Sequence, residues 1–421
     1  MIRKKRLKIF LATVGEPIPN DSSSTRLHKT GQISEWLSEK GHEVIFFNGS
    51  FDHQNRKQRY NYTKTLIINK NYKVVLLWGR EYSKSISLRR FLNHMDVARS
   101  FKRWYNENNE IPDIIICSYP IEELCKVFIS HYRKLNVPII IDCRDLWPDI
   151  FSEIFPKKIR LLSKIFFYPF EVKARKILSK ATAISGMTKS FRDWGLLKAR
   201  RKESSIDFIY PFTYLNKGLH KKKRLNTKSF TKENKLQICY LGTLTSRSNL
   251  ELFIKATSLI SLKNKLRFNL VIAGSGEESE NLVNLAKSLD APVEFTGYID
   301  QNKIYDILNQ SHLGLLTYSK KDFQLSIPNK VVEYLSAGLP IISCTKGEVE
   351  KLINENDCGI FVNEDINQIA SIIGKLISNG INQNMYLSSV RTFENQFNKE
   401  KVFKKIENHL YKIIQKENNK L

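Results

Sequence analysis

Short apolar runs rich in β-branched residues alternate with amphipathic helical patterns along almost the whole chain of 421 residues. Runs such as LKIFLATV and DIIIC in the first half, or RFNLVIAG and LPIIS in the second, are apolar almost throughout rather than at every second residue. Uninterrupted apolar strands separated by helices are typical of parallel sheets that helices cover on both faces. The pattern therefore predicts an α/β protein with doubly wound parallel sheets.

The length and a local shift in composition predict two Rossmann-like domains. A chain of this length exceeds what one ordinary hydrophobic core accommodates. Residues 213–235 contain few core-forming side chains and many cations, and a new strand pattern begins directly after them. We expect an N-terminal domain over residues 1–212, this linker, and a C-terminal domain over residues 236–397. Residues 398–421 carry apolar side chains at helical spacing and are predicted to form a helix that packs back on the N-terminal domain.

The net charge of +26 is confined to one part of the chain. Residues 1–250 contain 48 Lys and Arg against 22 Asp and Glu, whereas residues 251–421 contain 20 of each. Within the basic part, residues 155–180 combine eight Lys and Arg with aromatic and apolar side chains at helical spacing. Such a segment suits an anionic membrane surface, and a core helix with a solvated basic face is the alternative. Nucleic acid is disfavoured as a partner, because no DNA- or RNA-binding motif accompanies the charge.

The cysteines and the start of the chain bear on the compartment. Six cysteines are scattered without a CxxC pair, as is typical of buried small residues in a reducing compartment. The basic start followed by the apolar residues 9–14 imitates a signal peptide, but this run is too short and is predicted to be the first buried strand. No segment approaches the roughly 20 apolar residues of a membrane span. We therefore expect a cytoplasmic protein.

The segment LSIPNKVVEYLSAGLPII, residues 325–342, carries the clearest pattern of a ligand site. Ser326 is expected to cap a helix and Pro328 to lie in its first turn. Lys330 then lies near the helix start, where a cation opposes the helix dipole by roughly 0.3–1 kcal/mol. A bound diphosphate reverses this sign, and Glu333 one turn later suits the hydroxyls of a sugar. A solvated Lys–Glu pair on an ordinary helix is the alternative, and the spacing alone favours it.

This segment, together with GEVEKLI and CGIFV, resembles the donor site of retaining glycosyltransferases of the GT-B fold, family 4. It is most similar to the branch that builds bacterial O-antigen and capsule. YLGTLTSRSNLELFIKA, LVIAGSGEE and EFTGYIDQNKIYDILNQSHLGLL follow the family's order in the second half of the chain. GEPIPNDSSSTRLHKTGQISEWLSEKGHEV, FDHQ, IIDCRDLWPDIF and AISGMTKSF do so in the first half. The resemblance covers nearly the whole chain and implies two Rossmann-like domains that face each other across a cleft.

The resemblance places the donor nucleotide on the C-terminal domain. Glu333 matches the second glutamate of the family's E-x7-E signature, which holds the ribose, whereas Leu325 replaces the first glutamate. The arginine that usually follows the glycine is replaced by Thr243, which leaves Lys330 and Arg247 as the candidates for the diphosphate. The further donor-binding residues that the resemblance implies are Gly242, Thr243, Gly274, Ser275, Gly276, Tyr298, Ser326 and Asn329.

In the N-terminal domain the resemblance implies site residues beyond the carboxyl ends of the strands, where open α/β sheets bind ligands. The residues that follow the first strand are expected on the acceptor side, and a surface loop without a ligand is the alternative for them. The residues that follow later strands include Arg144, at the position where many family members carry a His near the reacting sugar. A structural pair of neighbouring Arg and Asp side chains is the alternative there. The acceptor-side residues are Gly15, Glu16 and Arg26. The predicted catalytic residues are His53, Arg144 and Asp145, together with Lys330 of the C-terminal domain.

The implied activity is transfer of a sugar from a UDP- or GDP-sugar to a hydroxyl of a polyprenyl-diphosphate-linked or other envelope glycan, with retention of configuration. We expect a hexosyltransferase-type enzyme that needs no cofactor and no metal, because no DxD-like motif is placed to hold one. It would bind the inner face of the cell membrane through its basic N-terminal half. A sugar-nucleotide epimerase on the same architecture is the first alternative, which Leu325 disfavours, and a nucleic-acid-binding protein is the second. The sugar, the nucleotide and the linkage stay open.

Overall fold

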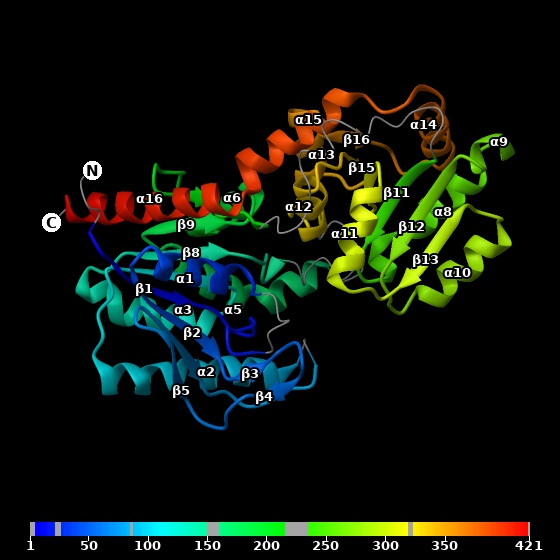
Figure 1. Ribbon diagram of the computed structural model, residues 1–421. Helices are drawn as coiled ribbons and strands as arrows, with labels where there is room; N and C mark the ends of the chain where they lie inside the picture. The colour runs from blue at the N-terminus through cyan, green and yellow to red at the C-terminus, as the bar shows by residue number, and fades with distance from the viewer. Residues whose placement is uncertain are drawn as a thin grey trace. The chain divides into compact units, whose positions relative to one another are not determined.

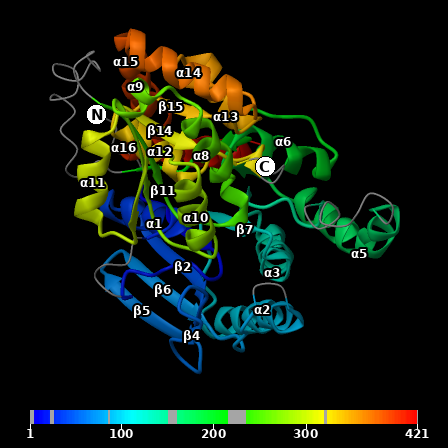
Figure 2. The ribbon, with the colours of Figure 1, turned by 90° about the vertical axis from the view of Figure 1, so that its right-hand side faces the viewer.

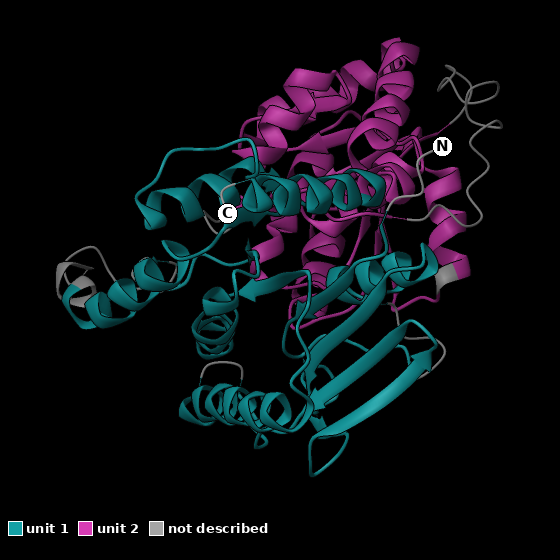
Figure 3. Cartoon of the chain, turned by 90° about the vertical axis from the view of Figure 1, so that its left-hand side faces the viewer, with its two compact units in different colours: residues 1–211, 403–421 teal, residues 212–402 magenta. Residues whose placement is uncertain are grey.

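The computed structural model describes residues 5–21, 27–84, 87–149, 160–214, 235–318 and 323–419. The chain divides into two compact units, which Figure 3 shows in different colours. Unit 1 comprises residues 1–211 and 403–421, and unit 2 comprises residues 212–402. Each unit is built on a sheet with helices on both faces (Figures 1 and 2). The prediction of an α/β fold with two Rossmann-like units is confirmed.

Unit 1 is built on an eight-stranded sheet, beside which lies a short hairpin. The sheet strands are β1 (Lys8–Ala12), β2 (Glu43–Gly49), β5 (Lys64–Asn69), β6 (Tyr72–Leu77), β7 (Ile114–Tyr119), β8 (Ile139–Cys143), β9 (Ala183–Gly186) and β10 (Phe208–Ile209), and the hairpin is β3 (Phe51–Asp52) with β4 (Lys57–Gln58). Their order is β10-β9-β8-β7-β1-β2-β6-β5, and β5 is antiparallel to its neighbour. The strand order reverses between β1 and β7, which makes the carboxyl ends of these strands the expected ligand-binding edge.

The helices of unit 1 lie on both faces of this sheet. They are α1 (Lys29–Glu39), α2 (Leu88–Asn108), α3 (Glu122–Tyr132), the short η1 (Arg133–Leu135), α5 (Arg160–Leu178), α6 (Lys189–Ala199) and most of α16 (Lys399–Asn418). Right-handed crossovers place α1 on one face and α2, α3, α5 and α6 on the other, because the chain reverses its direction across the sheet after β6. Helix α16 packs with α1, where the ring centroids of Trp36 and Phe403 are 5.9 Å apart.

The core of unit 1 is rich in aromatic side chains packed edge to face. The ring of Phe47 on β2 lies 5.1 Å from that of Phe10 and 4.8 Å from that of Trp104. Phe101 and Phe128 stand 4.2 Å apart in the same core. The six cysteines of the chain are free and buried, as their spacing predicts. The uninterrupted apolar runs of the sequence therefore correspond to strands with both faces covered.

Unit 2 is a second parallel sheet with the strand order β13-β12-β11-β14-β15-β16. Its strands are β11 (Leu236–Leu241), β12 (Phe268–Ala273), β13 (Val293–Gly297), β14 (Leu313–Leu316), β15 (Ile341–Ser343) and β16 (Gly359–Phe361). Its helices are η3 (Ser246–Ser248), α8 (Leu250–Ser258), α9 (Leu262–Lys265), α10 (Ser279–Ser288), α11 (Gln301–Gln310), α12 (Asn329–Ser336), α13 (Glu348–Asn356), α14 (Ile366–Asn379), α15 (Gln383–Thr392) and η5 (Phe393–Phe397). Two hydrophobic clusters cover the faces, one with Phe253 and Ile373 and the other with Val331 and Ile353.

Several predicted features fall at the edges of what the structure describes. The boundaries between the units lie at residues 211/212 and 402/403, and residues 215–234 of the predicted linker lie outside the described residues. The same holds for residues 150–159, which include the start of the basic aromatic segment. Over the described ranges, no helix combines the length and the hydropathy that crossing a membrane requires.

Candidate functional site

A pocket of about 620 Å³ lies in unit 2 beyond the carboxyl ends of β11 and β14. The strand order of this sheet reverses between these two strands, and open α/β sheets bind ligands at such a point. The loop after β11, the segment after β14 and the first turns of α12 form its wall. Of the residues predicted for the donor, those that line the pocket are Gly242, Thr243, Arg247, Asn329, Lys330 and Glu333. The other lining residues are Leu241, Thr245, Ser246, Glu277, Tyr318, Phe323 and Pro328.

Helix α12 starts differently from the prediction. Its first residue is Asn329, and Pro328 precedes it in an extended conformation with φ −61° and ψ 149°. The predicted capping role of Ser326 is wrong, because its hydroxyl donates to the carbonyl oxygen of Phe323 at 3.3 Å. The segment 323–326 thus forms its own turn, and α12 begins with backbone N–H groups that no side chain at the cap accepts from. The N–H of Val331 donates to the carbonyl oxygen of Pro328, and N–H groups at a helix start without a side-chain cap favour an anion.

The side chain of Lys330 is the most unusual group of this pocket. It is 8% exposed, and its ammonium finds no hydrogen-bond partner among the described residues. Burial lowers the pKa of Lys330 to about 7, and the nearby Glu333 carboxylate acts in the opposite direction. A buried ammonium without a partner is costly, so a bound anion that restores its hydrogen bonds is strongly favoured. Gly242, at φ +135°, makes room for this group, because a Cβ there would lie 3.0 Å from the Lys330 Nζ.

Two tyrosine rings contact the Lys330 ammonium, which lacks a hydrogen-bond partner among the described residues. Its Nζ lies 3.8 Å from the ring centroid of Tyr240 and 5.0 Å from that of Tyr318. The Tyr240 hydroxyl donates to the carbonyl oxygen of Thr243, and the Tyr318 ring stacks on that of Phe323 with centroids 3.9 Å apart. Aromatic faces attract a cation by roughly 0.5–2 kcal/mol. The rings therefore aim the ammonium into the pocket and favour its charged form.

The glycines after β12 serve close packing between neighbouring loops. A Cβ at Gly274 would lie 2.0 Å from the carbonyl oxygen of Gly242, and one at Gly276 would lie 2.1 Å from that of Leu244. The N–H of Gly276 donates to the Ser279 hydroxyl at 2.9 Å, and the carbonyl oxygen of Ser275 accepts from the N–H of Leu244. The glycines thus hold the loop that shapes one wall of the pocket, and their contact with a donor stays a prediction.

Two further positions of the predicted donor site lie away from the Lys330 ammonium. Tyr298 follows β13 and is 86% exposed, so its ring is accessible to a ligand but is outside the set that lines the pocket in the described chain. Leu325 is half-buried in the turn before α12. The donor-binding role of Tyr298 stays a prediction, and Leu325 places an aliphatic side chain in the turn before α12.

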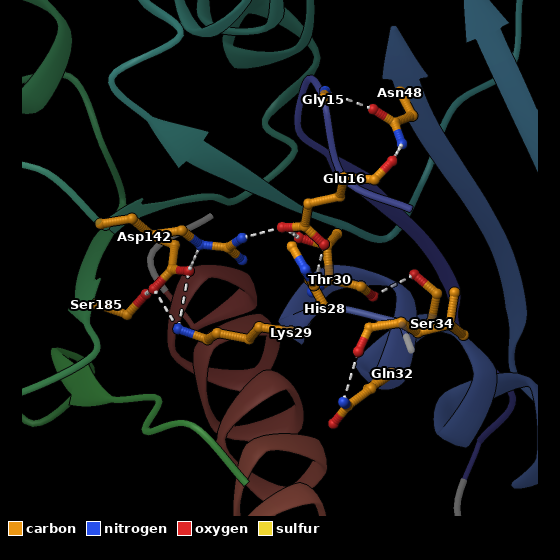
Figure 4. Close-up of polar contacts among 12 residues, drawn as sticks. Gly15, Glu16, His28, Lys29, Thr30, Gln32, Ser34, Asn48, Asp142 and Ser185 are labelled. Carbon is orange, nitrogen blue, oxygen red and sulfur yellow. Dashed lines mark hydrogen bonds and ion pairs between the residues drawn. The ribbon is translucent and has the colours of Figure 1, made fainter. Parts of the chain in front are cut away.

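Unit 1 contains a buried network of charged residues at the carboxyl ends of β1 and β8 (Figure 4). The Asp142 carboxylate is fully buried and binds the Lys29 ammonium with both oxygens, at 3.1 and 3.0 Å. It also accepts from the Nε of Arg144 at 2.7 Å and from the Ser185 hydroxyl at 2.8 Å. The guanidinium of Arg144 makes a second ion pair with Glu16. The carboxylate of Glu16 also accepts from the N–H of Thr30.

The charges in this network compensate one another. Burial alone would raise the pKa of Asp142, but the cations of Lys29 and Arg144 outweigh it and hold this pKa below the usual range. Burial and the neighbouring Arg144 lower the pKa of Lys29 to about 8, against the attraction of Asp142. Arg144, predicted as catalytic, is thus engaged by two carboxylates, Asp142 and Glu16. The sequence pointed to Glu16 and Arg144 but missed Lys29 and Asp142, which complete the set.

Gly15, another residue predicted in unit 1, is tied to this network through Asn48, which bonds both Gly15 and Glu16. Gly15, at φ +83°, donates its N–H to the Asn48 side chain at 3.0 Å, and a Cβ there would lie 3.0 Å from the Cβ of His53. His53 contacts the Tyr82 hydroxyl through Nδ1 at 2.8 Å. Asp145 accepts from the N–H of the following residue at 2.7 Å. Arg26 lies outside the described residues. No group of three or more His, Cys, Asp and Glu side chains in the described chain is placed to hold a metal ion.

Two units in one chain, each built on a doubly wound and mainly parallel sheet, define the GT-B fold. Sucrose-phosphate synthase of Thermosynechococcus elongatus matches 97% of this chain and 98% of its own, with a TM-score of 0.66 and 15% identity. HepE of Anabaena, solved with UDP-glucose, matches 97% of this chain and 100% of its own, with a TM-score of 0.57 and 12% identity. At these identities the likeness concerns the fold.

The sequence comparisons point to the same class. Residues 235–379 match the family described as Glycosyl transferases group 1. An uncharacterised glycosyltransferase of Methanocaldococcus jannaschii is 21% identical over 60% of this chain, and one of Haemophilus influenzae is 30% identical over 35%. The matches span 64% and 40% of those two proteins. The comparisons therefore show the GT-B fold for the chain and a likeness of residues 235–379 to glycosyl transferases group 1.

Proposed function

We propose that this chain is a retaining family 4 glycosyltransferase that moves a sugar from a UDP- or GDP-sugar to an acceptor hydroxyl, in the synthesis of O-antigen or capsule. The buried ammonium of Lys330, which lacks a hydrogen-bond partner among the described residues, carries the proposal. It lies at the start of α12, in a pocket at the switch point of a Rossmann-like sheet. A diphosphate is the anion that would satisfy the ammonium and the helix start together.

Departure of the nucleotide is the step that these residues would assist. The bond between the anomeric carbon of the sugar and the diphosphate oxygen breaks while the acceptor hydroxyl oxygen bonds to that carbon. Negative charge builds up on the leaving phosphate oxygen, which takes the proton of the acceptor hydroxyl. Lys330, Arg247 and the N–H groups at the start of α12 would stabilise this charge without a metal, since they are held ready in a partly closed pocket. Glu333, one helical turn after Lys330, would accept hydrogen bonds from the ribose. Retention of configuration rests on the family resemblance.

The acceptor is proposed to be a polyprenyl-diphosphate-linked or other envelope glycan, reached from the inner face of the cell membrane. Exposed apolar side chains of α5 support this, since Ile165, Phe166 and Tyr168 are 67%, 71% and 60% exposed. Lys176 in the last turn of α5 and Lys180 just after the helix are exposed, whereas Lys173 is paired with Glu122 and Glu123. Aromatic and apolar groups flanked by cations suit the interface of an anionic bilayer.

Calorimetry with a panel of UDP- and GDP-sugars tests the donor site. We expect one of these donors to bind, and Lys330→Met and Glu333→Gln each to weaken binding by at least about tenfold, as expected for loss of one charged contact. Lys255→Met, a substitution of the same kind at a half-exposed lysine of α8, is the matched control and should bind normally. Unchanged affinity in both pocket variants would remove the donor assignment.

Product analysis separates transfer from the alternative activity. With the donor that binds, we expect slow turnover without an acceptor and a new glycoside when a lipid-linked acceptor is added. Conversion of the sugar nucleotide into its epimer without acceptor would replace the proposal by a sugar-nucleotide epimerase.

Sedimentation with phosphatidylglycerol vesicles tests the membrane surface. The double variant Phe166→Ser, Tyr168→Ser should lose the vesicle binding that the control variant Arg103→Gln retains. Sedimentation of the double variant at the level of the unaltered protein would contradict the role of α5.

A further inference from the structure

The pocket of unit 2 has an aromatic end that the proposed contacts with the nucleotide do not use. Tyr318 follows β14, Phe323 begins the turn 323–326 before α12, and both line the pocket. Their rings stack with centroids 3.9 Å apart and planes 9° apart. Strand β11 lies between β12 and β14, so the loop after β11 lies between these rings and Glu277, which follows β12. The pocket thus has a carboxylate on the β12 side and aromatic rings on the β14 side.

Backbone contacts hold both rings at this end of the pocket. The N–H of Tyr318 donates to the Thr345 hydroxyl at 2.9 Å. Next to Phe323, the carbonyl oxygen of Gln324 accepts from the N–H of Glu348 at the start of α13, at 2.8 Å. A glycine at position 347, with φ +88°, leaves room for this contact, because a Cβ there would lie 2.1 Å from the same oxygen. The aromatic end is therefore fixed to its surroundings at two points.

The turn 323–326 presents an apolar group to the pocket. The N–H and the hydroxyl of Ser326 both donate to the carbonyl oxygen of Phe323, at 3.2 and 3.3 Å. Of the four residues of this turn, all of which the structure describes, Phe323 is the one that lines the pocket. The neighbouring Tyr318 ring already contacts the Lys330 ammonium, with Nζ 5.0 Å from its centroid. The Phe323 ring is therefore the group that this end of the pocket offers to a ligand beside the bound anion.

The order of the groups along α12 indicates which part of the donor meets the aromatic end. Lys330 lies in the first turn of the helix and Glu333 one turn later, whereas Pro328 and the turn 323–326 precede the helix. The nucleoside and the sugar of a donor are attached to opposite ends of its diphosphate. With the diphosphate on Lys330 and the ribose on Glu333, the sugar extends toward the residues before the helix. The aromatic end is therefore the place of the sugar.

We propose that Phe323, supported by Tyr318, selects a donor sugar that carries a methyl group, either that of a 6-deoxy sugar or that of an N-acetyl substituent. A methyl group buried against an aromatic ring gains by leaving water. A hydroxyl in the same place loses hydrogen bonds to water that the ring does not replace. One such group in an apolar pocket changes binding by roughly 10–200-fold. The proposal rests on the proposed function, since it names the class of sugar that the donor site accepts.

Matched donors that differ in one substituent test the selection in the unaltered protein. UDP-glucose, UDP-6-deoxyglucose and UDP-N-acetylglucosamine form one series, and GDP-mannose with GDP-6-deoxymannose forms the other. We expect calorimetry to show at least about tenfold tighter binding of one methyl-bearing donor than of the plain hexose of its series. The donor that binds more tightly identifies whether the methyl group belongs to a 6-deoxy sugar or to an N-acetyl substituent. Equal or tighter binding of the plain hexose in both series would overturn the proposal.

A variant of Phe323 assigns the selection to this residue. Phe323→Ala should abolish the preference for the methyl-bearing donor, and should weaken this donor more than it weakens free UDP or GDP. Phe361→Ala is the matched control, because Phe361 is half-buried on the edge strand β16 and is outside the set that lines the pocket in the described chain. This control should keep the preference. A preference that persists in Phe323→Ala, or equal losses for donor and free nucleotide, would overturn the role of Phe323.

The same measurements distinguish failure of this selection from failure of the proposed function. If neither UDP, GDP nor any donor of the two series binds, the assignment of the pocket to a nucleotide sugar fails. If the donors bind and Lys330→Met weakens all of them, but no methyl-bearing donor is preferred, the donor site stands and the selection by the aromatic end is wrong.

Discussion

Donor affinity should depend on pH through a single lysine. Burial lowers the pKa of Lys330 to about 7, so the free protein loses this positive charge as the pH rises through neutrality. A bound diphosphate stabilises the ammonium and raises its pKa again. Binding above pH 7 therefore has to include uptake of a proton, and the affinity decreases as the pH rises.

The size of the effect follows from this pKa. If the bound diphosphate lifts the pKa of Lys330 well above 8, the dissociation constant at about pH 8 is roughly tenfold that at about pH 6, or about 1.4 kcal/mol in binding free energy. The donor itself does not contribute, because both phosphates of a sugar nucleotide are diesters that stay ionised over this range. Calorimetry in two buffers of different ionisation enthalpy gives both the affinity and the number of protons taken up.

Two variants control for other titrating groups. Lys330→Arg keeps its charge at every pH tested and should bind with a flat profile. Lys330→Met should bind weakly and also show a flat profile. A flat profile in the unaltered protein, or a slope that persists in Lys330→Met, would refute the assignment of this lysine as the partner of the diphosphate.

Three further expectations concern stability and the groups around the two charged sites. Lys330→Met should stabilise the free protein by about 1–3 kcal/mol, because it removes a buried polar group without a partner among the described residues. Thermal unfolding at pH 6 measures this gain in stability. The gain should shrink above about pH 7, where the lysine becomes neutral in the folded state but not in the unfolded one. Tyr240→Leu should weaken donor binding and shift the midpoint of its pH profile downward, whereas Tyr240→Phe should not, since the ring and not the hydroxyl faces the ammonium. Asp142→Asn should cost about 3–5 kcal/mol in the free energy of unfolding, because it removes the carboxylate that pairs with the buried Lys29 ammonium and leaves Arg144 with Glu16 alone. Urea unfolding followed by circular dichroism checks this.

The sequence was sufficient for the architecture and for the chemistry of one helix start. Alternation of apolar strands and helices predicted both sheets, and the unfavourable position of Lys330 near a helix start pointed to an anion. What the sequence could not show is how the ammonium is surrounded. Tyr240 ends a strand pattern and Tyr318 follows another, so both look like core residues until the fold brings their rings to the same lysine.

The charged network of unit 1 shows a second limit. Arg144 and Glu16 are 128 positions apart, and their contact depends on β1 and β8 ending at the same edge of a sheet. Lys29 lies at the start of helix α1, and its residue type alone does not indicate a buried carboxylate partner 113 positions away. Ser326 shows the reverse case, because its residue type suits a helix cap but Pro328 occupies that position. Local chemistry predicts local roles, whereas partners distant in the chain require the fold.

The division of unit 1 into two stretches has a consequence for how the protein is made. Helix α16 lies in unit 1, where Tyr210 and His409 share a hydrogen bond of 2.7 Å and the Tyr411 hydroxyl donates to the carbonyl oxygen of Lys5. During synthesis, residues 1–211 leave the ribosome well before these partners exist, whereas every residue of unit 2 is available before α16 is finished. Unit 2 is therefore expected to reach its native state first, and unit 1 to remain open to chaperones and proteases until the final helix arrives.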